Sequence, residues 1–351
     1  MKEVRFSAAV FVGRFQPFHA AHLVLLRRAL GIAQRCVVVL GSSFQARTLR
    51  APFSWEERAA MIAACLPPEE RARVSFLPVR DYHDERRWFA AVERGVRDLL
   101  GEALGPVAVV GCIKDETREY LRRFPSWAPV LCDLIPGVRA QELRDLLFSE
   151  LCGRPERVRA ALEGGVPEAV ARFLEEWCRQ PGASYLEQEW RTLQRYRQEW
   201  AGSPFPPVFV TVDVVLRCAG QVLLVQRRHS LGKGLWAVPG GFLEQRETLY
   251  QCAVRELREE TGIDVPEEEL RSRLRGTEVF ADPDRSSRGR AITHAHYFDL
   301  GDDRDLPDVR AGDDAAAAQW MPVDRLMALE GSFHDDHFQI LDSFLGLSDM
   351  A

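Results

Sequence analysis

Residues 241–263 constrain this chain most, because glycine, charged and apolar positions recur there at fixed spacings. Gly241 is followed after five residues by Glu247, and the run Arg-Glu-Leu-Arg-Glu-Glu-Thr-Gly-Ile occupies 255–263. An apolar stripe with helical spacing lies between them, formed by Ala253, Val254 and Leu257. Gly262 suits the left-handed cap that ends many helices. The segment from about Glu247 to Thr261 is therefore predicted to be a helix.

Three glutamates of this helix share one face, because Glu256, Glu259 and Glu260 stand at i, i+3 and i+4. Their like charges repel one another, so the cluster by itself does not favour folding. A divalent cation reverses that balance, since Mg²⁺ or Mn²⁺ takes carboxylate oxygens as ligands and bridges them to substrate phosphates. Such an ion also lowers the pKa of bound water. The cluster predicts a site for a divalent cation that can bind phosphate and activate water.

The whole pattern resembles the Nudix box. The resemblance implies that Glu256 and Glu260 are the main metal ligands, that Glu259 is a further ligand or a base, and that Gly241 belongs to the metal site. Gly241 ends the turn 239–241, where the backbone must run close to the start of the helix. Glu247 and Arg255 are about two turns apart and can pair. With Gly262, they are the structural positions of the box.

The flanking segments predict an α/β/α sandwich. Strands are expected at 208–216, 221–227, 291–300 and 320–322, with a turn at Ala219-Gly220. The Nudix resemblance implies a nucleoside diphosphate linked to another group, and ADP-ribose is the substrate that the family resemblance suggests. Residues outside the box are expected to select it, namely Trp236, Phe280 and the loop 312–315. Asp313 and Asp314 of that loop supply a base or cap a turn.

The first half of the chain carries a different nucleotide motif. An apolar strand, Ala8–Val12, ends at Gly13 and is followed by a short loop and a helix from about His22. This is the first β–α turn of a doubly wound fold, where such sheets bind nucleotides. His19 and His22 both lie at the predicted helix N-terminus, where their side chains and the helix dipole can stabilise a phosphate. They are expected to stabilise charge during displacement of pyrophosphate from ATP.

The segment 8–22 resembles the His-x-Gly-His signature of the nucleotidyltransferases, and the order of further segments is similar to nicotinamide mononucleotide (NMN) adenylyltransferases fused to a Nudix domain. These segments are 41–47, 52–58, 79–82, 111–115 and 120–127. The resemblance implies phosphate stabilisation by His19, His22, Lys114 and Arg144. It implies substrate binding by Gly13, Arg14, Phe15, Arg47, Asp81, Trp88, Asp115 and Arg139. Asp81 and Trp88 would hold the nicotinamide, although Trp88 is equally expected as a half-buried packing residue.

Two departures from the family pattern concern phosphate binding. Ala21 stands where the first signature has glycine, and the second signature, Ile-Ser-x-Thr-x-x-Arg, reads Val-Arg-Ala-Gln-Glu-Leu-Arg at 138–144. Arg139 and Gln141 thus replace hydroxyl residues, while Arg144 is kept. Three readings follow: an active adenylyltransferase, a catalytically weak nucleotide-binding module that tunes the hydrolase, or a transferase with another phosphorylated acceptor.

Composition sets the remaining bounds. The net charge of −6 is spread over a chain of mixed sign without a basic block, so no nucleic-acid partner is expected. The eight cysteines are scattered without a Cys-x-x-Cys pair, which favours free thiols in a cytoplasmic protein and no zinc site. The sequence contains no run of about 18 apolar residues, so no membrane-spanning segment is expected.

The domain organisation follows from these segments. A Rossmann-like nucleotidyltransferase domain with a doubly wound parallel sheet is expected over 1–200, with strands at 36–40, 74–79, 108–111 and 130–134. Helices in 155–200 are expected to complete its core, and their aromatic residues are also compatible with a homo-oligomer. The Pro-rich segment 201–207 is the predicted linker, and the Nudix domain is expected over 208–351. ATP, NMN, NAD and ADP-ribose are the expected ligands, with Mg²⁺ or Mn²⁺ as cofactor.

Overall fold

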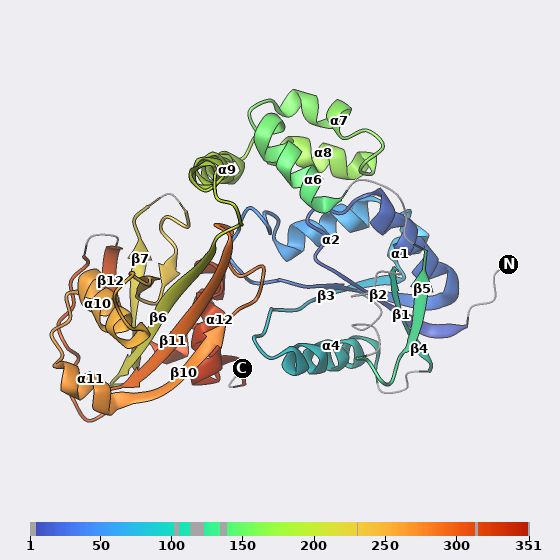
Figure 1. Ribbon diagram of the computed structural model, residues 1–351. Coiled ribbons are helices and arrows are strands. Elements are labelled where there is room, and N and C mark those ends of the chain that lie inside the picture. The colour runs from blue at the N-terminus through green and yellow to red at the C-terminus, as the bar shows by residue number, and fades with distance from the viewer. Residues whose placement is uncertain are drawn as a thin grey trace. The chain divides into compact units, whose positions relative to one another are not determined.

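The computed structural model describes residues 5–101, 105–112, 123–133, 139–229, 231–312 and 315–349. The chain divides into two compact units, Met1–Trp190 and Arg191–Ala351, which are considered separately (Figure 1). The predicted linker 201–207 is an exposed turn near the start of the second unit. No helix of the described ranges is both long enough and apolar enough to cross a membrane.

A parallel sheet of five strands forms the centre of the first unit. Its strand order is β3-β2-β1-β4-β5, and its strands are β1 (Phe6–Gly13), β2 (Ala33–Leu40), β3 (Val74–Pro78), β4 (Val107–Cys112) and β5 (Ala128–Cys132). The inner strands are nearly continuous apolar runs because both faces of the sheet are covered. The predicted doubly wound fold is confirmed, and the strand order reverses direction at β1, beside β4.

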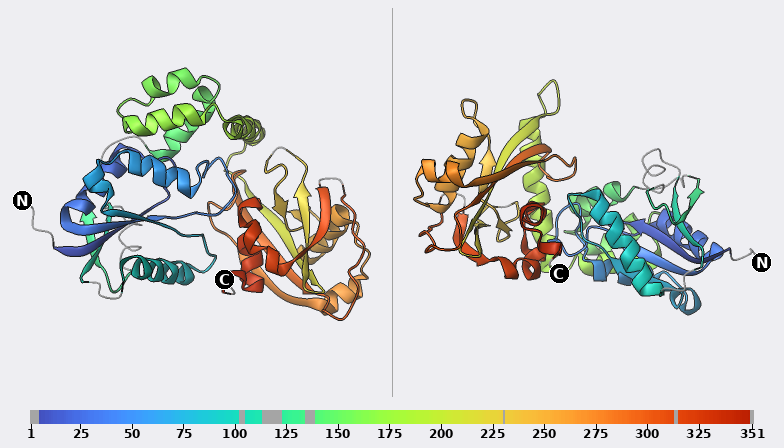
Figure 2. Two further views of the ribbon diagram at one scale, coloured as in Figure 1. Left: turned by 180° about the vertical axis from the view of Figure 1, so that it is seen from behind. Right: turned by 90° about the horizontal axis from the view of Figure 1, so that it is seen from below.

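Helices cover both faces of this sheet. Helix α4 (Glu85–Leu100) buries Val92 and Val96 against the strands. Figures 1 and 2 show α1 (Ala20–Ile32) and α2 (Trp55–Ala64) on the opposite face. A short helix, α3 (Pro68–Arg71), precedes β3. The loops after β1 and β2 therefore meet at the carboxyl edge of the sheet, where the predicted nucleotide site lies.

A group of helices follows β5. It comprises α6 (Ala140–Leu146), a π-helical turn (Leu147–Leu151), a 3₁₀ turn (Pro155–Arg157), α7 (Val158–Ala161), α8 (Glu168–Trp177) and α9 (Pro181–Glu199). Trp177 of α8 is buried and contacts Phe53, just before α2, edge to face at 4.9 Å between ring centroids. Val158, Val170 and Leu174 are also buried. Core packing is thus confirmed for these residues, whereas Tyr185 and Trp200 are exposed.

The second unit is a mixed sheet with helices on both faces. Its main strand order is β10-β11-β6-β7-β12, and the short strands β8 and β9 pair with β7 and β6. The strands are β6 (Val208–Cys218), β7 (Gln221–Arg227), β8 (Trp236–Ala237), β9 (Gly240–Phe242), β10 (Leu274–Phe280), β11 (Arg290–Asp299) and β12 (Ala315–Pro322). The helices are α10 (Leu249–Thr261), α11 (Glu267–Arg273) and α12 (His337–Leu345), with 3₁₀ turns at Val323–Arg325, Met327–Ser332 and Leu347–Asp349.

Strand β6 separates two cores by the alternation of its side chains. Val212 and Val214 pack with α10, whereas Val215 packs with α12. Figure 1 shows α10 and α12 on opposite sides of the sheet. The predicted α/β/α sandwich is therefore confirmed. Phe280, which the sequence suggested for substrate selection, is only 2% exposed and lies in the core beside α12.

Candidate active sites

The acidic helix of the second unit is α10, and its two ends are capped. The Thr248 hydroxyl accepts a hydrogen bond from the Gln251 N–H, so the helix begins at Leu249 instead of the predicted Glu247. Gly262 has φ of 59° and ends the helix in the left-handed conformation, as predicted. These caps fix the face that carries the glutamates.

Arg255 holds three glutamates and the loop before the helix. It donates to both oxygens of Glu247, at 3.0 Å from Nε and 2.7 Å from Nη2. Its Nη1 donates to Glu256 at 2.8 Å and to Glu259 at 2.9 Å, while Nη2 also reaches the Phe242 carbonyl at 3.2 Å. Arg255 lowers the pKa of Glu247 to about 2. The predicted Glu247–Arg255 pair is confirmed, and the guanidinium also restrains Glu256 and Glu259, two of the predicted metal ligands.

Glu260 points from the helix toward strand β9. Its Oε2 accepts a hydrogen bond from the Gly240 N–H at 3.1 Å. Burial raises the pKa of Glu260 to about 8, and the charges of Glu256 and Asp213 add to this effect. Burial also raises the pKa of Glu256. Two neighbouring carboxylates are thus held in a desolvated place, where a cation would stabilise their charged forms.

The donor set fits a divalent metal ion that also binds substrate. No group of three acidic, cysteine or histidine side chains in the described ranges forms a ready-made cage. Mg²⁺ does not need one, because it is usually bound by one or two carboxylates together with water and substrate phosphates. Glu256 and Glu260 provide such carboxylates, whereas Glu259 is 58% exposed and paired with Arg255. Asp313 and Asp314 lie outside the described residues.

Gly241 lies directly against Glu256, one of the predicted metal ligands. A Cβ atom at this position would come within 2.2 Å of Glu256 Oε1, which is the end of a flexible side chain. At Gly240, by contrast, a Cβ atom would meet the main-chain oxygen of Val212 at 2.3 Å. The close approach explains the glycine that the sequence pattern requires at position 241. Metal coordination through its main chain stays a prediction.

Gly241→Ala is expected to reduce diphosphate hydrolysis by about 10- to 100-fold, the range for losing the support of a metal ligand. The added methyl group displaces the Glu256 carboxylate, while the fold survives because that side chain can rotate. Steady-state rates at increasing Mn²⁺ concentration measure the effect, which excess Mn²⁺ should partly restore. Gly240→Ala is the comparison, because its clash with backbone should lower the melting temperature. Equal rates for Gly241→Ala and the parent would contradict this account.

A buried cluster of charged groups lies between strand β6, beside β9, and the start of α12, and sequence reasoning missed it. Asp213 of β6 faces Arg285, whose Nη2 lies 3.5 Å from Asp213 Oδ2. Arg285 also forms two hydrogen bonds of 2.8 Å to Asp336. His337 Nδ1 accepts from the Val238 N–H at 3.2 Å. The one available signal was an aspartate in the apolar run of 208–216, whose burial requires a partner.

His337 is expected to make the second unit less stable as the pH falls. Burial and the nearby Arg285, Arg227 and Arg288 lower its pKa to about 3, although Asp336 opposes them. The unfolded chain therefore binds a proton near pH 6.5 that the folded state does not, and one such group costs about 2 kcal/mol between about pH 7 and pH 5. His337→Asn keeps an acceptor for Val238 and should flatten that slope in urea unfolding curves. An unchanged slope would contradict the assignment.

In the first unit, His19 and His22 meet at the start of α1. The helix begins at Ala20, earlier than the predicted start near His22, so that His19 is its N-cap. The two imidazole rings stack with centroids 3.5 Å apart, and the main-chain N–H of His19 donates to His22 Nδ1 at 3.3 Å. The predicted placement of both histidines at one helix N-terminus is confirmed. Phe15 is buried with its ring edge-on to His22, so its side chain is not exposed for the predicted ligand contact.

Other predicted ligand residues of this unit already have protein partners. Arg144 Nη1 donates to the Gln16 carbonyl at 2.7 Å, which joins α6 to the loop after β1. Arg47 pairs with Glu57, and Asp81 accepts from the Ser42 N–H at 3.2 Å.

Three further residues bear on the predicted substrate contacts. Trp88 packs edge to face on Phe89, with ring centroids 5.3 Å apart, as the packing interpretation expected. Gly13 lies against the Phe15 ring, and the Arg14 carbonyl is a hydrogen-bond acceptor. Lys114 and Asp115 lie outside the described residues.

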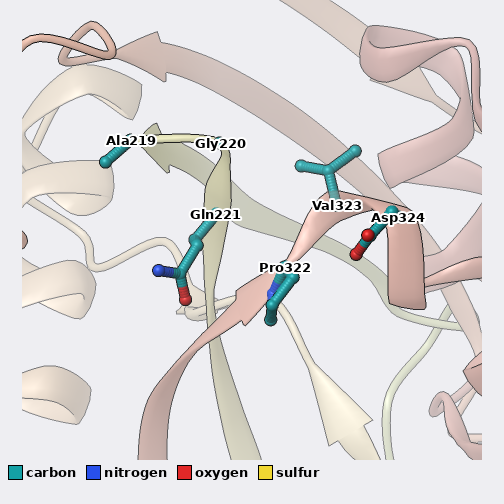
Figure 3. Close-up of a pocket in the computed structure, with 6 residues that line it drawn as sticks. All are labelled: Ala219, Gly220, Gln221, Pro322, Val323 and Asp324. Atoms are coloured by element: carbon teal, nitrogen blue, oxygen red, sulfur yellow. The ribbon is translucent and has the colours of Figure 1, made fainter.

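A surface cavity lies at the hairpin between β6 and β7 (Figure 3). It has a volume of about 540 Å³ and is lined by Ala219, Gly220, Gln221, Pro322, Val323 and Asp324. Ala219 and Gly220 form the predicted turn with positive φ angles. The lining includes none of the predicted catalytic or ligand-binding residues, so the cavity is not assigned to either site.

Family models match both halves of the chain. The Cytidylyltransferase-like family matches residues 10–99, and the NUDIX domain matches residues 207–344. The first match includes His19 and His22, and the second includes the whole of α10. The stacked histidines thus lie in the range matched by the Cytidylyltransferase-like family, and the glutamates of α10 lie in the range matched by the NUDIX domain.

Individual relatives repeat this division. The nicotinamide/nicotinic acid mononucleotide adenylyltransferase of Acinetobacter baylyi is 32% identical over 188 residues, covering 53% of this chain and 95% of that protein. The ADP-ribose pyrophosphatase of Methanocaldococcus jannaschii is 34% identical over 137 residues, covering 39% of this chain and 72% of that protein.

The similarity to solved structures extends over both halves, and one example illustrates it. It is a bifunctional NMN adenylyltransferase/ADP ribose pyrophosphatase from Francisella tularensis, complexed with AMP and a manganese ion. The TM-score is 0.87 at 31% sequence identity, and the match covers 97% of this chain and 99% of that one.

Proposed function

Because the chain belongs to the family of bifunctional NMN adenylyltransferases/ADP-ribose pyrophosphatases, we propose that it makes NAD in one unit and hydrolyses ADP-ribose in the other. The first reaction joins NMN to the AMP part of ATP and releases pyrophosphate. The second yields AMP and ribose 5-phosphate. The observation that carries the proposal is the presence of both site geometries in one chain, the stacked histidines at α1 and the partly buried Glu256 and Glu260 of α10.

The adenylyl transfer depends on position and charge. NMN supplies its phosphate as the nucleophile, so no side chain needs to form a covalent bond. His19 and His22 lie where imidazole N–H groups and the start of α1 can face the triphosphate. They would stabilise the charge that develops as pyrophosphate leaves. Arg144 donates to the Gln16 carbonyl in the same loop, and this bond would help to keep the two histidines in position.

The hydrolysis depends on carboxylates that hold a divalent ion. Such an ion, Mg²⁺ or Mn²⁺, neutralises charge on the diphosphate and makes water more acidic. Glu256 and Glu260 would hold it, with Glu260 fixed by the Gly240 N–H. Arg255 restrains Glu256 and Glu259 at the same face. Glu259, which is exposed, can serve as a further ligand or as a base that accepts a proton from water.

One observation favours a second candidate for the first unit, a nucleotide-binding module that tunes the hydrolase. Glu142 lies in the first turn of α6, and its Oε2 accepts from the Arg139 N–H at 3.1 Å. Its carboxylate therefore occupies the main-chain N–H of Arg139, the first of the two positions where the family signature has a hydroxyl residue, and its charge would repel a phosphate. Arg139 and Gln141 do not restore those hydroxyl groups.

The test is NAD formation by the purified chain given NMN, ATP and Mg²⁺, with ADP-ribose hydrolysis measured on the same sample. NAD and AMP as the two products support the proposal. Hydrolysis without NAD formation would reject NMN as the acceptor and leave the binding module or a transferase with another phosphorylated acceptor. Absence of ADP-ribose hydrolysis with either Mg²⁺ or Mn²⁺ would reject the other half of the proposal.

A further inference from the structure

Arg58 of α2 is a fully buried arginine whose five N–H donors are all used. Its side chain has no exposed surface, although its charge would be costly to bury without partners. Nη1 donates to the carbonyls of Arg14 and Gly41, each at 2.7 Å. Nη2 donates to the Ser42 carbonyl at 3.3 Å and the Ser43 hydroxyl at 3.2 Å, and Nε donates to the Ser54 carbonyl at 3.3 Å.

These acceptors belong to two loops that follow neighbouring strands. Arg14 lies in the loop from β1 to α1, which carries His19, and Gly41 to Ser43 lie in the loop after β2. One planar guanidinium therefore ties both loops together at the carboxyl edge of the sheet. The Gly41 N–H also donates to the Gly13 carbonyl at 3.1 Å, so the two loops are in direct contact beside the guanidinium.

The same two loops contain strained backbone. Phe15, Ser42 and Phe44 are not glycines, yet their φ angles are 49°, 51° and 69°. Such a backbone conformation is unfavourable for a residue with a side chain, and it persists only where surrounding contacts hold it. Arg58 bonds to the carbonyl just before Phe15 and to the carbonyl of Ser42 itself. The strain and its restraint thus coincide at the predicted ATP site.

The positive charge of Arg58 is offset by carboxylates that do not contact it directly. Among the described residues, no carboxylate forms an ion pair with it, and its pKa is lowered to about 10 by burial, against the charges of Asp81, Glu56 and Glu57. Asp81 accepts a hydrogen bond from the Ser42 N–H at 3.2 Å. Ser42 is therefore held on both sides, with its carbonyl on Arg58 and its N–H on Asp81.

We propose that Arg58 is a positioning residue for adenylyl transfer, which sets the loops after β1 and β2 in the conformation that places His19 against the triphosphate. This inference rests on the proposed transferase function. Arg58 does not touch substrate, because it is buried beneath the loops. Its effect arises from geometry, and a displacement of about 1 Å at a reacting centre can cost about a hundredfold in rate.

The experiment compares Arg58→Lys and Arg58→Met with a matched arginine in the full chain. Arg73 donates to the carbonyls of Leu30, Ala33 and Gln34, at the other end of β2. Arg73→Met therefore removes a similar set of main-chain bonds away from the ATP site. Each variant is assayed for NAD formation, for ADP-ribose hydrolysis, for urea unfolding, and for amide hydrogen exchange in peptides covering residues 13–16 and 41–45.

Both Arg58 variants are expected to lose about a hundredfold in kcat for NAD formation, with faster exchange in both loops and unchanged ADP-ribose hydrolysis. Lysine does not rescue, because its three donors cannot reach five acceptors. Arg73→Met should lower stability while keeping the kcat of the parent. If Arg58→Met fails to fold, Arg58→Lys decides alone.

Two results would overturn the inference. One is a folded Arg58 variant with the parent's kcat, and the other is loss of activity without faster exchange in either loop. A parent chain that forms no NAD would reject the transferase itself. Exchange in the two loops would then still decide whether Arg58 fixes them.

Discussion

Replacing Glu260 with Gln lowers the rate of ADP-ribose hydrolysis by at least about a hundredfold, because even outer-shell partners of a bound metal contribute about 10- to 100-fold. The amide keeps the size of the side chain and an oxygen for the Gly240 N–H, so the local packing survives. It cannot supply the negative charge that a divalent ion requires. The loss should therefore appear in kcat and in the Mn²⁺ concentration needed for half-maximal rate.

The control is the same substitution at Glu268, an exposed residue of α11 outside the metal face. Glu268→Gln should hydrolyse ADP-ribose like the parent, and both variants should form NAD at the parent rate. A calorimetric titration with Mn²⁺ measures metal binding directly, so that weaker binding can be distinguished from a slower chemical step. If Glu260→Gln binds Mn²⁺ and turns over like the parent, Glu260 is not a metal ligand.

The fold of both units was predictable because each follows a strong local pattern. Apolar runs such as 36–40 and 108–111 mark strands buried on both faces, and all of the predicted strands are found with ends shifted by a few residues. Helix α10 was equally predictable, because its apolar stripe and its Gly262 cap both indicate a helix that ends near residue 261. Ends were less predictable because capping decides them, as the Thr248 hydroxyl does for α10.

The sites were predictable only where neighbours in sequence are also neighbours in space. His19 and His22, or Glu256 and Glu260, share a helix, so their spacing fixes their common face. Partners that come from distant segments left no such signal.

Two arginines show what sequence spacing could not reveal. Arg255 contacts Glu247 as expected, yet it also donates to Glu256 and Glu259, which are predicted metal ligands. Arg58 lies 44 residues from Arg14, and only the folded sheet brings the two together.

Replacing His19 with Ala lowers the rate of NAD formation by about 10²- to 10³-fold, the usual cost of removing one hydrogen-bond donor to a developing negative charge. The reason is its place as N-cap of α1, beside the backbone N–H groups that can face the triphosphate. Because the interaction strengthens as pyrophosphate leaves, kcat should fall more than the KM for ATP rises. A coupled assay of pyrophosphate release at varied ATP concentration measures both kcat and the KM for ATP.

The stacking of His19 on His22 makes the double variant informative. Their ring centroids are 3.5 Å apart, so loss of either ring removes the stack that orients the other, and the main-chain N–H of His19 also donates to His22 Nδ1. The two residues are therefore expected to act as a unit, and His19→Ala/His22→Ala should lose little more than His19→Ala alone. Alanine at the exposed His229 of the second unit is the control and should change neither activity. Independent, multiplying losses, or normal NAD formation by His19→Ala, would show that this pair does not serve the transferase.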